Sequence, residues 1–322
     1  MMEDIRVDAD QIRQASDQLR AGHLVVFPTE TVYGLGADAG NAQAVNKIYA
    51  LKGRPLGHPL IVHLESASHM RAWAKDIPAL AWELAEAFWP GPMTLILPRA
   101  AKVSDAITGG QDSVGLRVPA HPVAQALLRA FGAGVAAPSA NRYGRVSPTR
   151  AQHVRDEFGA DTPLLLEGGA CAVGLESTII SLLDEPLLLR PGGVAREALE
   201  AVTGPIRRAR VGEGPRASGT TLMHYAPATP LHWVSADALP TVTDGATAVL
   251  SRRPAPAGFA GHWIEASSDP VQYGHDLYEQ LRQLDRVGAR TILVEAVPQG
   301  SAWEAIADRV DRAAATHRDV SL

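Results

Sequence analysis

Two short polar motifs carry side chains suited to binding phosphate. Lys52 and Arg54 are separated by one glycine, and Ser139 and Asn141 by one alanine. Two cations beside one crevice suit a triphosphate, because both their charge and their donor geometry match phosphate oxygens. Ser139 and Asn141 offer neutral donors for phosphate or sugar oxygens, but Ser and Asn also commonly shape turns. Either motif alone is therefore compatible with a binding role or a purely structural one.

The common nucleotide-binding and hydrolase signatures are absent from the sequence. No Gly-x-x-x-x-Gly-Lys-Ser/Thr loop occurs, and Gly34-Leu35-Gly36 lacks the third glycine at the spacing of a dinucleotide fingerprint. A Gly-x-Ser-x-Gly elbow and a His-Glu-x-x-His zinc pair are also missing. Any ATP site must therefore be of another kind.

Three segments carry polar residues directly at the ends of predicted strands, at residues 27–39, 51–64 and 136–149. Side chains just past strand ends converge on the crevice where α/β proteins bind ligands. Lys52 and Arg54 lie in an irregular Gly-Pro stretch, so we do not expect them on the surface of a helix. We expect both side chains to be exposed at this crevice and to contribute little to the core.

The apolar pattern predicts strands that alternate with helices. Strands are expected at 24–27, 60–64, 93–98, 114–118, 135–137, 164–167, 177–183, 187–190, 247–250 and 291–294. Helices are expected at 9–20, 41–51, 66–74, 78–88, 122–131, 149–157, 271–287 and 301–316. Continuous apolar strands interleaved with helices predict an α/β sheet buried by helices.

Residues 204–230 interrupt this pattern, since they are rich in Gly, Pro, Arg and Thr and have no apolar period. They are predicted to form a long structureless linker, which is usually functional or flexible. The β-α-β pattern beyond them predicts a smaller Rossmann-like α/β domain. The predicted organisation is a larger first domain at 1–204, a linker at 205–234 and a smaller C-terminal domain at 235–322.

The composition bounds the class of protein. Hydrophobic residues make up 46% and charged residues 20%, which excludes a disordered chain. The net charge of -5 argues against a general nucleic-acid coat protein, although residues 45–155 carry thirteen Lys and Arg against six acids. That basic stretch indicates either an anionic ligand or ordinary surface charge.

The single cysteine and the absence of long apolar runs suggest the compartment. Cys171 has no intramolecular disulfide partner, it cannot build a thiolate metal site alone, and we assign it no role. The acidic start lacks the order of a signal peptide, and no apolar run approaches membrane-spanning length. We expect a cytoplasmic protein without membrane association.

Lys52, Arg54, Ser139 and Asn141 together match the Lys-x-Arg…Ser-x-Asn signature of the YrdC-like family. The sequence also resembles that family, in the same order, at residues 28–35 (PTETVYGL), 59–63 (PLIVH), 89–94 (WPGPMT), 117–119 (RVP), 147–149 (SPT), 176–178 (EST) and 190–192 (RPG). The HYAP sequence at 224–227 and the second α/β domain resemble the long, two-domain form of the threonylcarbamoyl-AMP synthase family. The resemblance implies a YrdC-like twisted mixed sheet with helices in the first domain.

The resemblance also implies one concave site shared by L-threonine and ATP. The residues that match its threonine side are Thr31, His63, Arg117, Ala137 and Ser177. Those that match its ATP side are Lys52, Arg54, His58, Ser113, Ser139, Asn141, Ser147, Arg190 and Tyr225, with Lys52 and Arg54 as catalytic residues. Arg117 suits the amino-acid carboxylate, since a guanidinium can bind it through two nitrogens. A lone strand-end histidine such as His63 is more often a core residue, but the family match favours a ligand role.

The implied reaction makes N-carboxythreonine from threonine and bicarbonate or CO2. Its new carboxylate attacks the α-phosphate of ATP and expels pyrophosphate. Mg²⁺ is expected with ATP, no tightly bound organic cofactor is expected, and the metal ligands are not identified by the sequence. The product is expected to pass to a tRNA threonylcarbamoyl-transfer complex, while direct tRNA binding is left open.

Two departures from the family pattern affect the ATP side. His58 stands where many relatives carry Asn, so its contact with ATP would depend on pH. Residues 218–223 (SGTTLM) stand where relatives often have Pro-Gly-Met-Lys, which removes a lysine. A cationic role for that stretch is therefore in doubt.

Two other functions compete with this interpretation. An RNA-binding module without ATP turnover would use the basic stretch, but aromatic residues are only 5% and base-stacking motifs are absent. A carbamoyl-transfer enzyme of hydrogenase maturation also contains a YrdC-like domain. That architecture resembles a larger chain with zinc-binding cysteine pairs, which this sequence lacks.

The linker is predicted to act as a lid over ATP. Tyr225 combines an aromatic ring with a polar tip, and Gly212, Gly214 and Gly219 would let the segment swing. A lid would shield residues 207–216 from proteolysis when ATP binds. The alternative is that Tyr225 only pins the linker to one domain.

Overall fold

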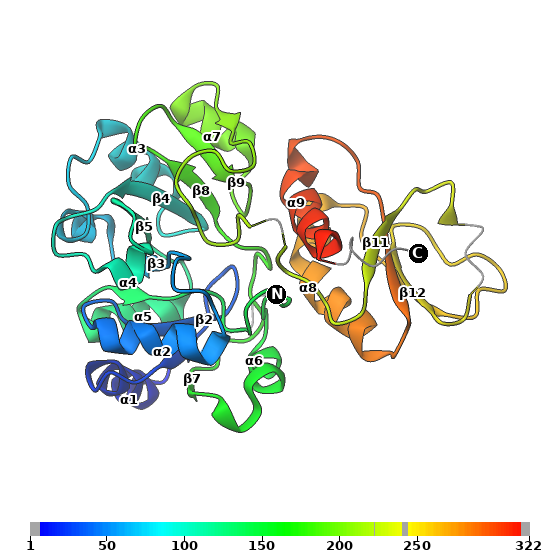
Figure 1. Cartoon of the computed structure of the whole chain (residues 1–322), viewed down its shortest axis with the longest axis horizontal. Coiled ribbons are helices and arrows are strands. Elements are labelled where there is room, and N and C mark those ends of the chain that lie inside the picture. The colour runs from blue at the N-terminus through cyan, green and yellow to red at the C-terminus, as the bar shows by residue number, and fades with distance from the viewer. Residues whose placement is uncertain (1–6, 222, 240–243, 317–322) are drawn as a thin grey trace. The chain divides into compact units, whose positions relative to one another are not determined.

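The computed structural model describes residues 7–221, 223–239 and 244–316. The chain divides into two compact units (Figure 1). The first consists of Met1–Tyr143 and Pro148–Thr220, and the second of Gly144–Ser147 and Thr221–Leu322. The predicted linker at 205–234 is thus shared between the two units.

The first unit is built on one ten-stranded mixed sheet, with strand order β10-β9-β8-β4-β5-β3-β6-β2-β1-β7. In chain order the strands are β1 (Val25–Phe27), β2 (Gly34–Asp38), β3 (Ile61–His63), β4 (Met93–Pro98), β5 (Ser113–Arg117), β6 (Val135–Ala136), β7 (Leu164–Leu165), β8 (Thr178–Ser181), β9 (Leu187–Arg190) and β10 (Arg207–Arg208). The central strands β3, β5 and β8 are buried along their whole length, as their continuous apolar runs predict.

Helices cover this sheet. They are α1 (Ala9–Arg20), α2 (Ala42–Lys52), α3 (Ala79–Phe88), α4 (Asp105–Thr108), α5 (Pro122–Phe131), α6 (Ala151–Phe158) and α7 (Arg196–Thr203), with the 3₁₀ helices η1 (Ala67–Ala72) and η2 (Gly159–Asp161). Helix α1 packs against α5, and α3 against α7 (Figure 1). The apolar stripe of α1, formed by Ile12, Ala15 and Leu19, joins a core that includes Leu127 of α5.

Helix α2 begins and ends on clear local signals. The Asn41 side chain accepts hydrogen bonds from the Gln43 and Ala44 amides and so caps the start of the helix. Gly53 ends the helix in the left-handed conformation, with φ of 63°. Lys52 is therefore the last residue of α2, and its predicted place in an irregular segment outside any helix is wrong.

Residues 205–220 are not the structureless linker that the sequence predicts. Strand β10 pairs in parallel with β9, and Arg207 donates two hydrogen bonds to the Glu213 carboxylate. The Arg216 amide donates to the Gln111 side chain, and Gln111 donates back to the Arg216 carbonyl. The Gln111–Arg216 bonds join residues far apart in the chain, and the Arg207–Glu213 bonds depend on two polar side chains, so apolar periodicity could not reveal either contact.

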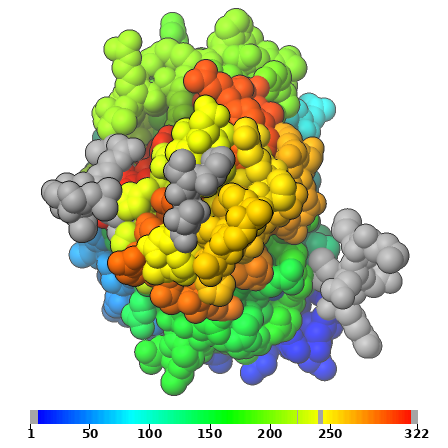
Figure 2. Space-filling view, turned by 90° about the vertical axis from the view of Figure 1, so that its right-hand side faces the viewer, coloured from blue at the N-terminus to red at the C-terminus, as the bar shows by residue number. Residues whose placement is uncertain are grey.

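The second unit contains a four-stranded parallel sheet with order β11-β14-β12-β13. Its strands and helices are β11 (Leu231–Val234), β12 (Thr247–Ser251), β13 (His262–Glu265), α8 (Pro270–Arg286), β14 (Thr291–Glu295) and α9 (Ser301–Ala315). Strand β11 begins inside the predicted linker, because its apolar residues are too few to stand out. Figure 2 shows the surface of this unit in yellow to red. The predicted class, a mixed α/β sheet plus a smaller Rossmann-like α/β domain, is confirmed.

Candidate active site

Strand pairing brings three of the predicted threonine-side residues, His63, Arg117 and Ser177, to one end of the first sheet. His63 ends β3 and pairs in register with Arg117, which ends β5. Ser177 directly precedes β8, whose first residue Thr178 pairs with Met93 at the start of β4. The Ala137 amide donates to the Ile61 carbonyl, which aligns the backbone after β6 beside β3. The sheet thus gathers residues that are far apart in the sequence.

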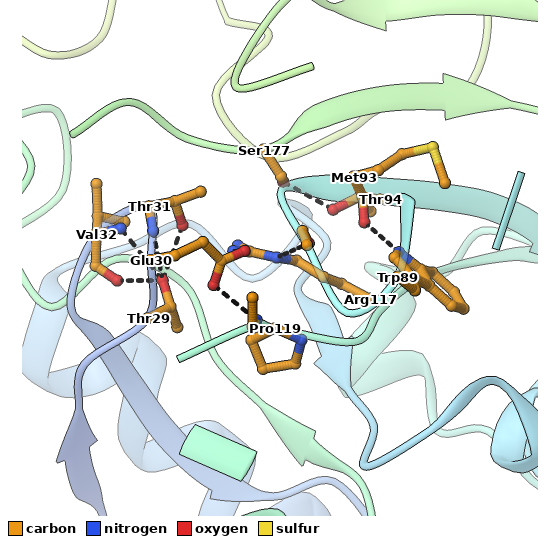
Figure 3. A network of polar contacts seen from close by, with 12 residues as sticks. Thr29, Glu30, Thr31, Val32, Trp89, Met93, Thr94, Arg117, Pro119 and Ser177 are labelled. Atoms are coloured by element: carbon orange, nitrogen blue, oxygen red, sulfur yellow. Dashed lines mark hydrogen bonds and ion pairs between the residues drawn. The ribbon is translucent and has the colours of Figure 1, made fainter. Parts of the chain in front are cut away.

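Arg117 is held by a buried ion pair. Its Nη2 lies 2.6 Å from Oε1 of Glu30, and its Nε donates to the Gly91 carbonyl at 3.3 Å. The other Glu30 oxygen accepts from the Ala120 amide at 2.9 Å (Figure 3). Within the described chain, Nη1 of Arg117 has no protein acceptor, so that nitrogen remains available to a carboxylate. Such a pair fixes the plane of the guanidinium before substrate arrives.

His63 is a neutral, buried imidazole. Only 4% of the residue is exposed, and its Nδ1 has no hydrogen-bond partner among the described residues. Burial, together with the nearby positive charge of Arg117, lowers the pKa of His63 to about 3. A buried polar nitrogen without a partner is costly, and a substrate group that bonds to it would remove that cost.

Two pairs of buried hydroxyls flank Arg117 (Figure 3). Thr31 Oγ1 lies 2.8 Å from Thr29 Oγ1, and Ser177 Oγ lies 2.8 Å from Thr94 Oγ1. The motifs proposed Thr31 and Ser177 as threonine-side residues but gave no role to Thr29, Thr94 and Glu30, which bond to Thr31, Ser177 and Arg117 respectively. For Thr29 and Glu30 the available signal was their place beside Thr31 in the PTET sequence. Thr94 gave no signal beyond the WPGPMT match.

Lys52 is buried, with 3% of the residue exposed, so its expected exposure is wrong. Its Nζ donates to the Ser139 carbonyl at 2.6 Å and to the Asn141 carbonyl. Burial and the charge of Arg54 lower the pKa of Lys52 well below its usual value. Through these two bonds the Lys52 nitrogen holds the backbone of the Ser-x-Asn loop in place and so links the two motifs physically.

Arg54 is also buried, with 7% of the residue exposed, so the expectation that its side chain is exposed is wrong as well. Its Nη2 donates to the Pro59 carbonyl at 2.9 Å and to Ser218 Oγ at 3.1 Å. His58 Nδ1 lies 3.2 Å from the Tyr143 hydroxyl. Partial burial and the charge of Arg54 lower the pKa of His58.

Arg190 connects the threonine side to the segment that follows β10. Its Nη2 donates to Ser177 Oγ at 3.1 Å and to the Ser177 carbonyl at 2.7 Å, while Nη1 donates to the Ser218 carbonyl at 2.7 Å. Ser113 and Ser218 line the same small cavity, of about 10 Å³, above Ile61 and Ile96. Ser218 thus contacts two of the cations predicted to bind ATP.

Two predicted ATP residues, Ser147 and Tyr225, belong to the second unit. Tyr225 is 1% exposed, and its backbone φ is 63°. The Arg309 guanidinium lies 5.1 Å from the centre of its ring, and the Tyr278 ring stacks at 5.9 Å. These contacts favour the alternative in which Tyr225 pins the chain to one unit.

No group of three or more His, Cys, Asp or Glu side chains that could hold a metal ion occurs in residues 7–221, 223–239 and 244–316. Across the same part of the chain, no helix is long and apolar enough to cross a membrane. Cys171 is buried, which raises the pKa of its thiol far above its usual value.

Two family profiles match the chain. Residues 17–192 match the family described as telomere recombination, and residues 194–315 match the C-terminal domain of threonylcarbamoyl-AMP synthase. The boundary between the two matches lies before the one between the two structural units.

Similar proteins span nearly the whole chain. Threonylcarbamoyl-AMP synthase from Pyrococcus abyssi is 38% identical, over 96% of this chain and 95% of its own. The Bacillus subtilis synthase is 37% identical, over 97% and 95%. The crystal structure of P. abyssi Sua5 complexed with L-threonine superposes with a TM-score of 0.90 at 36% identity, covering 97% of this chain and 96% of that one.

Proposed function

The chain belongs to the threonylcarbamoyl-AMP synthase family, and we propose that it makes L-threonylcarbamoyladenylate and pyrophosphate from L-threonine, bicarbonate or CO2, and ATP. Members of this family transfer a nucleotidyl group. The observation that carries the proposal is the buried Glu30–Arg117 pair beside His63, which prepares one guanidinium edge for an amino-acid carboxylate. The relative solved with L-threonine supports the same substrate.

Threonine would bind with its carboxylate on Arg117 and its side chain toward the hydroxyl pairs. A guanidinium already oriented by Glu30 loses little conformational freedom when it binds the carboxylate. His63 stays neutral over the working pH range, so its Nδ1 can bond to substrate without adding a second positive charge. The arrangement selects an amino acid by its carboxylate and then by its side chain.

The proposed reaction has two bond-forming steps. The threonine nitrogen attacks the carbon of CO2, loses a proton and becomes a carbamate. A carbamate oxygen then attacks the α-phosphorus of ATP, the bond from that phosphorus to the bridging oxygen breaks, and pyrophosphate leaves. No protein residue is covalently modified, so catalysis rests on positioning and on neutralising phosphate charge. Arg54 and Arg190 are the cations proposed for that charge.

We further propose that Mg²⁺ enters with ATP. The described residues offer no all-protein cage for it, and Mg²⁺ usually binds through substrate phosphates, waters and at most one or two carboxylates. The metal would neutralise phosphate charge. The proposed role of the product is to supply the threonylcarbamoyl group for tRNA modification by a separate transfer complex.

Pyrophosphate release with single amino acids tests the proposal. The protein is incubated with ATP, Mg²⁺, bicarbonate and L-threonine, L-serine or L-valine. We expect release with threonine, less with serine, and least with valine, because a site that hydrogen-bonds a hydroxyl rejects an analogue lacking it more strongly than one lacking a methyl group. Equal release with valine, or release that does not depend on the amino acid, would contradict the proposal.

A further inference from the structure

The hydroxyl oxygen of Thr29 takes part in four hydrogen bonds, one of them with the Thr31 hydroxyl. The Thr29 residue is 2% exposed, and its hydroxyl donates to the Val32 carbonyl at 2.7 Å. The same oxygen accepts from the Thr31 and Val32 amides, each at 3.2 Å, and lies 2.8 Å from the Thr31 hydroxyl (Figure 3). Thr29 therefore closes a tight local turn and also bonds to Thr31, which is predicted to bind the substrate.

These contacts determine which hydroxyl donates to the other. A threonine hydroxyl carries one proton, and that of Thr29 is committed to the Val32 carbonyl. In the 2.8 Å contact between the two hydroxyls, Thr31 is then the donor and Thr29 the acceptor, and the two amides at 3.2 Å share the second lone pair of Thr29. Thr31 is fully buried and has this as its one hydroxyl bond among the described residues. Its oxygen is left with lone pairs alone, so it can only accept from a ligand.

Ser177 has the opposite polarity. Its hydroxyl oxygen accepts from Arg190 Nη2, and its other neighbour is the Thr94 hydroxyl. Thr94 is fully buried, and Ser177 Oγ is the one acceptor for its proton within the described chain. When Thr94 donates to Ser177, the Ser177 proton remains for a ligand. Of the two hydroxyl pairs that flank Arg117, the Thr31 pair thus presents an acceptor to a ligand and the Ser177 pair presents a donor.

We infer that Thr29 is a specificity-determining residue that acts through Thr31, by making Thr31 a pure acceptor for the proton of the substrate hydroxyl. The inference rests on the proposed threonine substrate. A side-chain hydroxyl both donates and accepts, so it satisfies Thr31 and Ser177 together. A methoxy oxygen in the same place can accept a hydrogen bond from Ser177, but it has no proton to donate to Thr31. Its lone pairs would therefore face the lone pairs of the Thr31 oxygen. Thr29 itself does not touch the substrate and is a positioning residue.

The test compares L-threonine with O-methyl-L-threonine in the full-length protein. Pyrophosphate release gives kcat/KM for both amino acids in the wild type and in Thr29→Val, which keeps the volume of Thr29 but removes its hydroxyl. Without that acceptor the Thr31 proton can turn toward the methoxy oxygen. We expect the threonine-to-methyl-ether ratio of kcat/KM to fall by about tenfold or more in Thr29→Val, since an unsatisfied buried hydrogen-bonding group has an effect of that size.

Three further variants separate polarity from loss of structure. Thr29→Ser restores the hydroxyl and should restore the wild-type ratio. Thr94→Val removes a buried hydroxyl of the same size from the same network but leaves Thr31 committed to Thr29, so its ratio should stay near that of the wild type. If Thr29→Val does not fold, Thr29→Cys supplies a weaker acceptor of similar size and should lower the ratio to a smaller extent.

The outcomes distinguish the inference from the function on which it rests. A wild type that releases no pyrophosphate with threonine overturns both. A wild type active on threonine, with the same ratio in Thr29→Val and Thr29→Cys, overturns only the role of Thr29. An equal fall of the ratio in Thr94→Val also overturns it, because loosening of the network would then explain the effect.

Discussion

Because Lys52 is buried, its side chain has a structural role that its place in a phosphate-binding motif does not predict. Its ammonium satisfies the carbonyls of Ser139 and Asn141 in the interior, where an unpaired carbonyl is costly. The side chain therefore contributes to the shape of the Ser-x-Asn loop, in addition to any contact with phosphate.

Lys52→Ala should lower stability as well as activity. Removing the ammonium leaves two buried carbonyls without a donor, which should lower the free energy of unfolding by about 2–4 kcal/mol. Urea unfolding and pyrophosphate release measure the two effects. An inactive Lys52→Ala protein with wild-type stability would instead support the exposed, phosphate-only role that the motif suggests.

Glu30→Gln should weaken threonine binding. An amide oxygen can still accept from Arg117, but the charge is lost and the amide NH2 would face the Ala120 amide. A charge-assisted bond is about twice as strong as a neutral one, so we expect KM for threonine to rise about tenfold, with a smaller change in kcat. The KM for ATP provides the internal control. A rise confined to the ATP KM would contradict the assignment of Arg117 to the amino acid.

At this scale the motifs name candidate residues but not their surroundings. Arg117, His63 and Ser177 were named as threonine-side residues from motifs, and the strand register explains why these three lie close together. The ion pair with Glu30 and the burial of Lys52 depend on contacts across dozens of residues. No local pattern carries that information.

At the scale of elements, the segment after β10 differs most from expectation. Its Gly and Pro content predicts a free linker, yet Ala217 packs with Ile61, Ile96 and Ile179 in an apolar cluster. Ser218 bonds to Arg54 through its hydroxyl and to Arg190 through its carbonyl. ATP phosphates that bind these guanidinium groups would have to compete with Ser218.

ATP should therefore increase trypsin cleavage after Arg216, whereas a lid would decrease it. Loss of the two Ser218 bonds, each contributing about 1 kcal/mol and together about 2 kcal/mol, would raise the open population and the initial cleavage rate by up to about thirtyfold. Mass spectrometry of the fragments gives the rate with and without ATP. The variant Ser218→Gly should be cleaved faster than the wild type even without ATP. Protection by ATP would restore the lid interpretation.

At the scale of the whole molecule, each unit has its own sheet and its own core. Most helices and long strands were predicted to within a few residues, because caps and apolar runs define them locally. The strands β2, β10, β11 and β13 and the helices α4 and α7 were missed. They are short, glycine-rich or half-exposed, and pairing with neighbouring strands or packing on other helices stabilises them.

Tyr225→Ala should destabilise the second unit. The buried ring contacts Arg309 and Tyr278, and removing a buried aromatic ring usually costs about 3–5 kcal/mol. Hydrogen exchange followed by mass spectrometry should show lost protection in α8 and α9, with the first sheet unchanged. Tyr225→Phe keeps the ring and should behave nearly as wild type. Unchanged hydrogen exchange in α8 and α9, together with a raised KM for ATP, would instead favour the interpretation in which Tyr225 is part of a lid over ATP.

The second unit is assembled from two separate stretches of polypeptide. Residues 144–147 belong to it, with Arg145 bridged to Ala226, the Ala226 amide bonded to the Gly144 carbonyl, and Arg282 bonded to the Val146 carbonyl. A gene divided after the codon for Thr220 would therefore encode a C-terminal polypeptide that lacks a piece of its own domain. The missing piece would be carried by the N-terminal polypeptide, and the two products should find each other when they are co-expressed. The natural boundary for dissecting this protein is consequently not a single point in the chain.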